Sequence, residues 1–221
     1  MFKFLIKKNK GAIIHLFKVV DATYIMNTDN LIAILKLCDE TLYRGKFMSE
    51  YDTCLNYGDK NYSNYIKAIE YANKRRIPIV FLLIFNKTNE RSKNYFGYGN
   101  PNENKTEKDS ADLIDFEIFI EDEFFIETSE FATFLKKFNE IFPVNYGYAS
   151  VLNSAFKKKD DRAIELREML IESNATKTPF LFPYNILNSK HLEFWENELG
   201  GVFLEGDEVG ENLFLVVEDK L

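Results

Sequence analysis

Glycine, proline, cysteine and histidine are all scarce in this chain of 221 residues, which contains 10 Gly, 5 Pro, 2 Cys and 2 His. Few Gly and Pro residues argue against flexible linkers and low-complexity segments. Hydrophobic residues make up 46% of the chain and include 21 Phe and 12 Tyr, so a sizeable core is expected. The length suits one large domain or two small ones.

The few cysteines and histidines limit the chemistry that the chain can perform. Cys38 and Cys54 form no CxxC motif, and Cys38 lies on the apolar face of a predicted helix, which favours a buried free thiol over a disulfide. A triad based on His15 or His191 is not expected, since His15 lies inside a strand-like run. The chain has no nucleophile elbow, P-loop, GxGxxG or calcium-loop motif, so we predict no catalytic residue, metal site or cofactor.

Long apolar runs are also missing, because no run reaches the ~18 residues that a membrane span needs. Lysines interrupt the first apolar residues, so no signal peptide is expected, and we interpret the protein as cytoplasmic. The net charge of −7 disfavours binding to nucleic acid, which needs a basic surface. An acidic surface instead suits a basic protein partner, and self-association is left open.

Hydrophobic periodicity predicts alternating helices and strands. Helices are expected at 29–44, 62–75, from Ser129 to Pro143, at 160–173 and from Ser189 to Gly200, and strands at 2–6, 12–20, 77–85, 145–152, 180–187, 202–205 and 212–218. A turn is expected at 206–210, between the last two strands. Thr28 or Asp29 is expected to cap the first helix, and 45–61 is a short strand or a loop. This order predicts an α+β fold with a mixed, mostly antiparallel sheet flanked by helices. Residues 1–221 form one domain, built on one sheet or of two related α+β halves.

The polar segment 86–112 is expected to be a long connection, and long connections in compact domains are often functional. Its aromatic residues stand between glycines, where they either form a protruding contact patch or pack onto their own loop. These candidate contacts are Tyr95, Phe96 and Tyr98.

Acidic residues gather just after this segment, with eleven acids against two lysines between Glu103 and Glu130. Strand-like alternation points Ile114, Phe116, Ile118 and Ile120 to one face of a strand and two acids to the other, and a turn then leads to a second short strand of a hairpin. The acids form either a solvated sheet face or a docking face for a basic partner. The candidate contacts are Asp115, Glu117, Glu121, Asp122 and Glu123.

The stretch 143–201 has the most distinctive residues, including the single Trp. We expect Trp195 in the core and His191 at the surface. The order of elements in residues 130–221, with Gly147-Tyr148-Ala149 after a helix and Leu199-Gly200-Gly201 at the end of another, resembles the type VI secretion immunity family. Tyr184 stands where that family's pattern has a Trp.

The resemblance implies a stoichiometric antitoxin that binds a cognate effector toxin in the bacterial cytoplasm and occludes its active site. The acidic surface of this chain would suit a toxin with a basic, nuclease-like cleft. Two alternatives stay open. One is a non-catalytic adaptor that uses the same acidic face, and the other is a hydrolase that works through carboxylates near 115–123.

Overall fold

The computed structural model describes residues 11–21, 24, 26–43, 51–55, 60–62, 65–74, 79–86, 91–99, 111–151, 160–178, 180–200 and 206–216. The described helices are α1 (Thr28–Thr41), α3 (Tyr65–Lys74), η4 (Phe125–Glu127, a 3-10 turn), α4 (Ser129–Ile141), α5 (Asp160–Glu172) and α6 (Ser189–Glu198). The strands are β1 (Ala12–Asp21), β2 (Tyr51–Leu55), β3 (Lys60–Tyr62), β4 (Ile79–Asn86), β5 (Arg91–Gly99), β6 (Ala111–Ile120), β7 (Tyr146–Val151), β8 (Tyr184–Asn188), β9 (Asp207–Val209) and β10 (Asn212–Val216).

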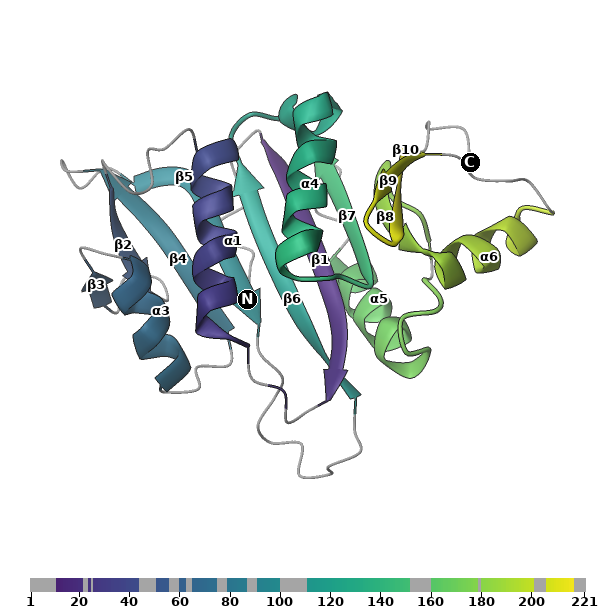
Figure 1. The fold of residues 1–221 in the computed structure, drawn as a ribbon, viewed down its shortest axis with the longest axis horizontal. Helices are drawn as coiled ribbons and strands as arrows, with labels where there is room; N and C mark the ends of the chain where they lie inside the picture. Colours follow the sequence, from purple (N-terminus) through teal and green to yellow (C-terminus); the bar gives the residue numbers. More distant parts are fainter. Residues whose placement is uncertain are drawn as a thin grey trace.

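All of these strands join one sheet in the order β3-β2-β4-β5-β6-β1-β7-β8-β10-β9 (Figure 1). Every pairing between neighbours is antiparallel. The α+β class is therefore confirmed, while the described part of the sheet is antiparallel throughout. The assignment of residues 1–221 to one domain stays a prediction.

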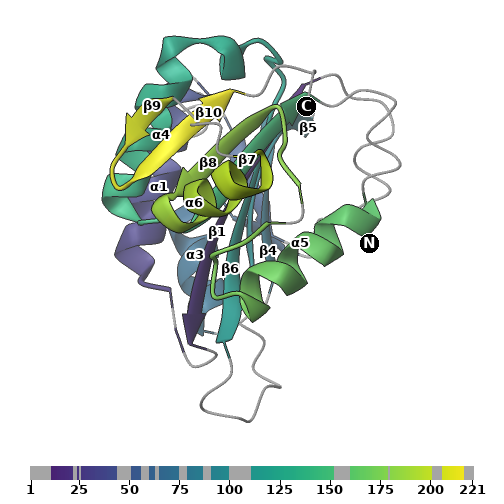
Figure 2. The same cartoon turned by 90° about the vertical axis from the view of Figure 1, so that its right-hand side faces the viewer.

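Each face of the sheet carries its own hydrophobic core. Helices α1, α3 and α4 cover one face, and α5 lies on the other (Figure 2). Residues of β1 alternate between the two cores: Ile14 and Leu16 pack beneath α1 and α4, and Phe17 packs with Leu166 and Leu170 of α5. Because both faces are covered, β1 contributes apolar residues to both cores.

Most expected elements are confirmed. In α4, Phe131, Phe134, Leu135 and Phe138 are at most 1% exposed, as their spacing predicts. The segment 45–61 contributes strands β2 and β3, and Cys38 is a buried free thiol. Asn27, one residue before the expected caps, caps α1 by accepting a hydrogen bond from the Asp29 N–H.

Three expected elements and the expected exposure of His191 are wrong. Segment 86–112 contains β5, which pairs with both β4 and β6, because alternating aromatic residues and glycines fit between those strands. The expected second strand of the hairpin is the 3-10 turn η4, and the expected turn at 206–210 contains β9. His191 is 0% exposed, because the first turn of α6 packs it beside Tyr146 of β7.

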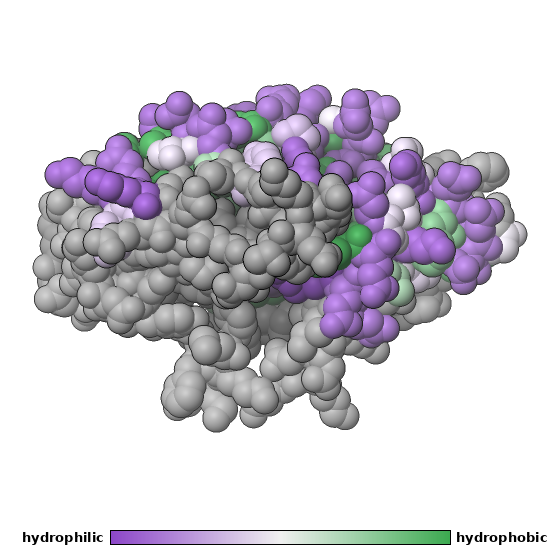
Figure 3. All heavy atoms as spheres, turned by 90° about the horizontal axis from the view of Figure 1, so that it is seen from below, coloured by the Kyte–Doolittle hydropathy of each residue, from purple (hydrophilic) through white to green (hydrophobic). Residues whose placement is uncertain are grey.

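Several expectations fall on residues that the structure does not describe, namely the strands at 2–6 and 202–205. Within the described ranges, none of the helices combines the length and the apolar character needed to cross a membrane. On the face seen from below, described hydrophilic side chains predominate and hydrophobic ones form small separate areas (Figure 3). The described part of this face therefore shows no broad apolar surface.

Candidate functional site

The structure distributes the candidate contact residues over three places. The aromatic candidates lie in β5, Asp115 and Glu117 lie on β6 beneath α5, and Glu121, Asp122 and Glu123 follow the end of β6. These groups do not form one continuous surface, because β5 is an internal strand and neighbouring residues of β6 point to opposite faces.

Two of the aromatic candidates are core residues. Phe96 is 0% exposed and Tyr98 is 2% exposed, and the Phe96 ring lies 6.0 Å from that of Phe116. Pairing of β5 on both sides places these rings beneath α1 and α4 instead of in a protruding loop. Of the two alternatives for these rings, the protruding contact patch is therefore wrong for Phe96 and Tyr98, and the side chain of Tyr95 lies outside the described residues.

Asp115 belongs to a charged cluster between the sheet and α5. Its Oδ2 accepts a hydrogen bond of 2.5 Å from Arg167 Nη1, and its Oδ1 lies 3.5 Å from His15 Nδ1. Glu117 is 8% exposed and stands directly opposite His15 in the pairing of β1 with β6. For Asp115 and Glu117 the alternative of a solvated sheet face is therefore wrong, because Arg167 of α5 packs against Asp115 and Glu117 is buried.

The aromatic rings and carboxylates around His15 determine the pKa of its imidazole. Its ring stacks on Tyr148 with 4.8 Å between centroids and on Phe17 with 5.9 Å. Burial alone lowers the pKa of His15, but hydrogen bonding to Asp115 and the negative charges of Glu117 and Asp115 outweigh it, so the pKa is raised above 6.5. Burial also raises the pKa of Tyr148 well above 10, so that hydroxyl stays neutral.

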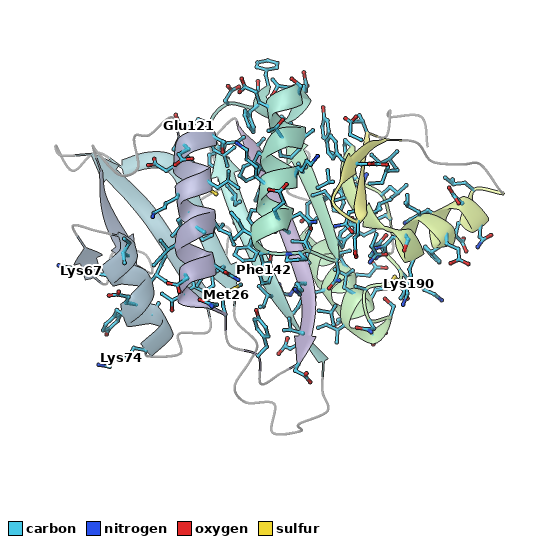
Figure 4. All side chains as sticks on the ribbon, viewed as in Figure 1. Met26, Lys67, Lys74, Glu121, Phe142 and Lys190 are labelled. Carbon is cyan, nitrogen blue, oxygen red and sulfur yellow. The ribbon has the colours of Figure 1, made fainter. Side chains whose placement is uncertain are left out.

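The remaining acidic candidates lie in a rigid, exposed turn, which we call the acidic turn and define as residues 121–130. It contains five acids and no cation: Glu121, Asp122, Glu123, Glu127 and Glu130. All are exposed except the half-buried Glu123. Figure 4 places Glu121 near the upper ends of α1 and α4, far from the labelled Lys67, Lys74 and Lys190.

Buried residues hold the acidic turn in place. Phe125 and Ile126 are 8% and 1% exposed, and the Phe125 ring meets that of Phe131 edge-on at 5.9 Å. Asp122 Oδ1 accepts a hydrogen bond of 3.1 Å from the Phe124 N–H, and the Thr128 hydroxyl donates one of 2.7 Å to the Phe125 carbonyl. The turn is therefore organised before any partner arrives.

Phe124, which sequence reasoning missed, is the candidate contact residue that the structure adds to the acidic turn. Its side chain is 64% exposed, whereas neighbouring Phe125 is buried. The positive N-terminal end of α4 accounts for Glu130, since acids are favoured in the first turn of a helix, and Glu127 forms a hydrogen bond with the Tyr184 side chain. Core packing does not account for an exposed phenylalanine among carboxylates. The sequence alone does not show which ring of the pair Phe124-Phe125 faces solvent, because the 3-10 turn η4 sets the direction of each side chain.

A metal centre is not evident in the described part of the chain, where no three His, Cys, Asp or Glu residues are placed to hold an ion. The acidic turn is a candidate protein-contact surface. It combines negative charge for long-range attraction with one aromatic side chain for a desolvated contact.

Comparison with protein-family models found no match for this chain, and comparison with curated proteins found none either. Among solved structures, the fold is similar to that of the Pseudomonas aeruginosa T6SS protein PA0821, with a TM-score of 0.53 and 11% sequence identity. The alignment covers 94% of this chain and 65% of that chain. The likeness extends well beyond residues 130–221, and this chain spans less than two thirds of the neighbour's length.

Proposed function

We propose that this protein is an immunity protein that binds a cognate effector toxin of a type VI secretion system and neutralises it by stoichiometric occlusion. The observation that carries the proposal is the rigid acidic turn with Phe124 at its surface. The fold likeness to a T6SS protein supports the setting. In this proposal the protein acts in the bacterial cytoplasm and catalyses no reaction.

The physical basis is electrostatic attraction followed by a local apolar contact. The acidic turn carries five of the carboxylates of a chain whose net charge is −7. Such a field speeds the approach of a basic surface, and its effect weakens as salt screens it. Phe124 then enters an apolar recess of the toxin, and burying one exposed aromatic ring slows dissociation. The carboxylates occupy positions that a nucleic-acid substrate's phosphates would take in a basic cleft.

The first experiment identifies the toxin and tests protection. The tagged protein is captured from its native cells, and the toxin gene is then expressed with and without this chain. We expect the capture to give a single stoichiometric partner with a toxin domain. Cells that express this toxin should grow only when this chain is expressed with it. A partner without toxicity, or toxicity that this chain does not relieve, would contradict the proposal and favour the adaptor reading.

The second experiment tests the surface. The double variant Glu121→Lys/Asp122→Lys should slow association with the captured toxin by roughly tenfold or more at low salt and reduce its salt dependence. The matched control is Glu193→Lys/Glu198→Lys on α6, which changes the net charge equally at exposed positions. Equal slowing in both variants would show that only overall charge matters, and the acidic turn would then not be the docking surface.

Phe124 provides an independent test of the same surface. Phe124→Ala should leave the melting temperature unchanged, because the ring is largely in water, and should raise the dissociation rate by roughly tenfold or more. Phe194→Ala is the control, since Phe194 is a partly exposed ring on α6, the helix that also carries the charge control. Unchanged dissociation of the Phe124 variant would remove Phe124 from the interface.

A further inference from the structure

In the described part of the chain, two large hydrophobic side chains stand out in water, namely Phe124 and Val216. Phe124 is 64% exposed in the acidic turn, and Val216 is 55% exposed at the end of β10. Single exposed apolar residues are common on any protein. Two of them on one surface, beside a concentration of charge, instead indicate a contact site.

A series of aromatic contacts connects the acidic turn to the strands at this edge of the sheet. The Phe125 ring meets that of Phe131 on α4 at 5.9 Å, and Phe131 meets Phe214 of β10 edge-on at 5.4 Å. Phe214 in turn stacks on Tyr184 of β8, with 6.4 Å between ring centroids. Strands β9 and β10 lie beside α4 in both ribbon views (Figure 1, Figure 2). The acidic turn and the ends of β8 and β10 are therefore packed on a shared core.

Glu127 and Tyr184 link the two exposed side chains. The Glu127 N–H donates a hydrogen bond of 3.0 Å to the Phe124 carbonyl, and residues three apart in a 3-10 turn lie on the same side. The Tyr184 side chain forms a hydrogen bond with Glu127. Tyr184 also stands directly opposite Val216 in the pairing of β10 with β8, so these two side chains leave the same face of the sheet about 5 Å apart. Phe124, Glu127, Tyr184 and Val216 therefore form one row, which we call the turn–strand surface.

The turn–strand surface places a carboxylate between two exposed apolar side chains. A cation on a partner would meet Glu127, while apolar side chains on either side of that cation would cover Phe124 and Val216. Arginine suits this place better than lysine, because its flat guanidinium can bond a carboxylate and also stack on the half-buried ring of Tyr184. The other carboxylates of the acidic turn attract the same basic partner.

We propose that the docking surface extends from the acidic turn across Glu127 and Tyr184 to Val216, and that it binds a segment of the partner protein in which an arginine stands between apolar side chains. The inference rests on the proposed function and adds contacts on β8 and β10 to it. Tyr184 is a positioning residue, because its hydrogen bond holds the Glu127 carboxylate beside the strand ends. Phe124 and Val216 supply the apolar contacts on the two sides of that carboxylate.

Two labelled peptides of equal charge test this chemistry on the intact protein without the toxin. One alternates arginine with leucine and the other alternates arginine with serine, and fluorescence anisotropy measures both affinities. We expect the leucine peptide to bind roughly tenfold more tightly, since its side chains bury apolar surface. Val216→Ser should reduce this ratio with no change in melting temperature, because Val216 is largely in water, whereas Phe194→Ala on α6 should leave the ratio unchanged. Equal affinities of the two peptides, or a ratio that Val216→Ser does not alter, would overturn the proposal.

A double-mutant cycle tests the positioning role of Tyr184. Tyr184→Phe keeps the ring and removes the hydroxyl that bonds Glu127, so it should weaken binding of the arginine–leucine peptide severalfold. In the Glu127→Gln background the same change should have little further effect, because the carboxylate is already gone. Fully additive losses would show that Tyr184 does not act through Glu127 and would contradict this part of the proposal.

The captured toxin distinguishes this inference from the proposed function. Val216→Lys should raise the toxin's dissociation rate by roughly tenfold, since a lysine repels the partner's arginine and replaces an apolar contact. Asn197→Lys on α6 is the control, because it adds the same charge at an exposed position. Equal rates for the two variants, with a toxin that this chain still neutralises, would overturn the extended surface and leave the immunity proposal standing. Peptide binding as expected without a toxin among the captured proteins would support the surface and contradict the immunity proposal.

Discussion

The indole Nε1 of Trp195 donates a hydrogen bond of 2.9 Å to the hydroxyl oxygen of Thr178. Thr178 is 1% exposed, while Trp195 is half-buried against the core beneath α5. The bond therefore joins α6 to the segment that precedes β8. It also explains why an aromatic residue with a polar edge suits this position, since a buried hydroxyl needs a partner.

Truncation of Trp195 should destabilise the protein. Trp195→Ala should lower the free energy of unfolding by about 3 kcal/mol, the low end for aromatic truncations because the ring is only half-buried. Trp195→Phe keeps most of the apolar contact and should cost about 1–2 kcal/mol through the lost hydrogen bond. Denaturant unfolding measures both values. An unshifted transition combined with lost toxin binding would instead make Trp195 an interface residue.

Gly147 on β7 should not tolerate a side chain. A Cβ there would lie 2.7 Å from Leu16 Cδ2 and 2.9 Å from Ile186 Cδ1, closer than packed carbon atoms allow. Gly147→Ala should therefore cost about 1–3 kcal/mol through overpacking. Gly200→Ala is the contrasting variant, because its Cβ meets nothing within 4 Å and its cost comes from a φ of +74° alone. An unchanged free energy of unfolding of Gly147→Ala in chemical denaturation would show that the neighbouring side chains move aside without cost.

His191 should make the protein sensitive to acid. Burial lowers the pKa of His191 to about 4, and the backbone of Lys177 offsets this only partly. Between about pH 6.5 and 4 the unfolded chain binds a proton that the folded chain does not. Stability should therefore fall as pH falls through this window, by an amount on the order of 3 kcal/mol.

The measurement compares unfolding free energies of the wild type and His191→Leu from pH 7 to 4. The variant should lose less stability over this range than the wild type, because carboxylates titrate equally in both. Parallel pH profiles would show that His191 takes up its proton without leaving the core.

Asn188 joins three parts of the C-terminal region and should contribute more than an ordinary helix cap. Its Oδ1 accepts hydrogen bonds of 3.0 Å from the N–H groups of Lys190 and His191, and its Nδ2 donates to the carbonyls of Asn145 and Ala175. Asn188→Ala should cost about 2–3 kcal/mol, since buried carbonyls also lose their partners. Asn27→Ala at α1 removes one cap bond and should cost about 1 kcal/mol. Equal losses in chemical denaturation would contradict this comparison.

Helices with a single apolar stripe were predictable because one side of each faces one core. In α1 and α4 the apolar residues recur every three or four positions, and the structure buries those residues. Strand β1 was predictable because it is a local run of β-branched and aromatic residues. The arrangement of the two cores on either side of β1 was not predictable, because β-branched and aromatic residues on both faces do not show which helix covers which face.

The errors fall where a distant element decides the environment. Strand β5 was assigned to a loop because its Asn, Lys and Gly residues disfavour strands, yet β4 and β6 supply partners on both sides. His191 was expected at the surface because it opens a helix rich in charge. Its burial depends on Tyr146, which is 45 residues earlier in the chain and has a ring centroid 5.3 Å away.

The candidate site divides in the same way. The sequence by itself determined that acids concentrate between Glu103 and Glu130, that the chain is acidic overall and that an α+β fold follows from the order of its elements. Only the tertiary structure decided which acids reach water, since α5 covers Asp115 and Glu117 while the acidic turn stands beyond the end of β6. Composition sets how many charges a chain carries, whereas packing of elements distant in sequence sets which of them a partner can reach.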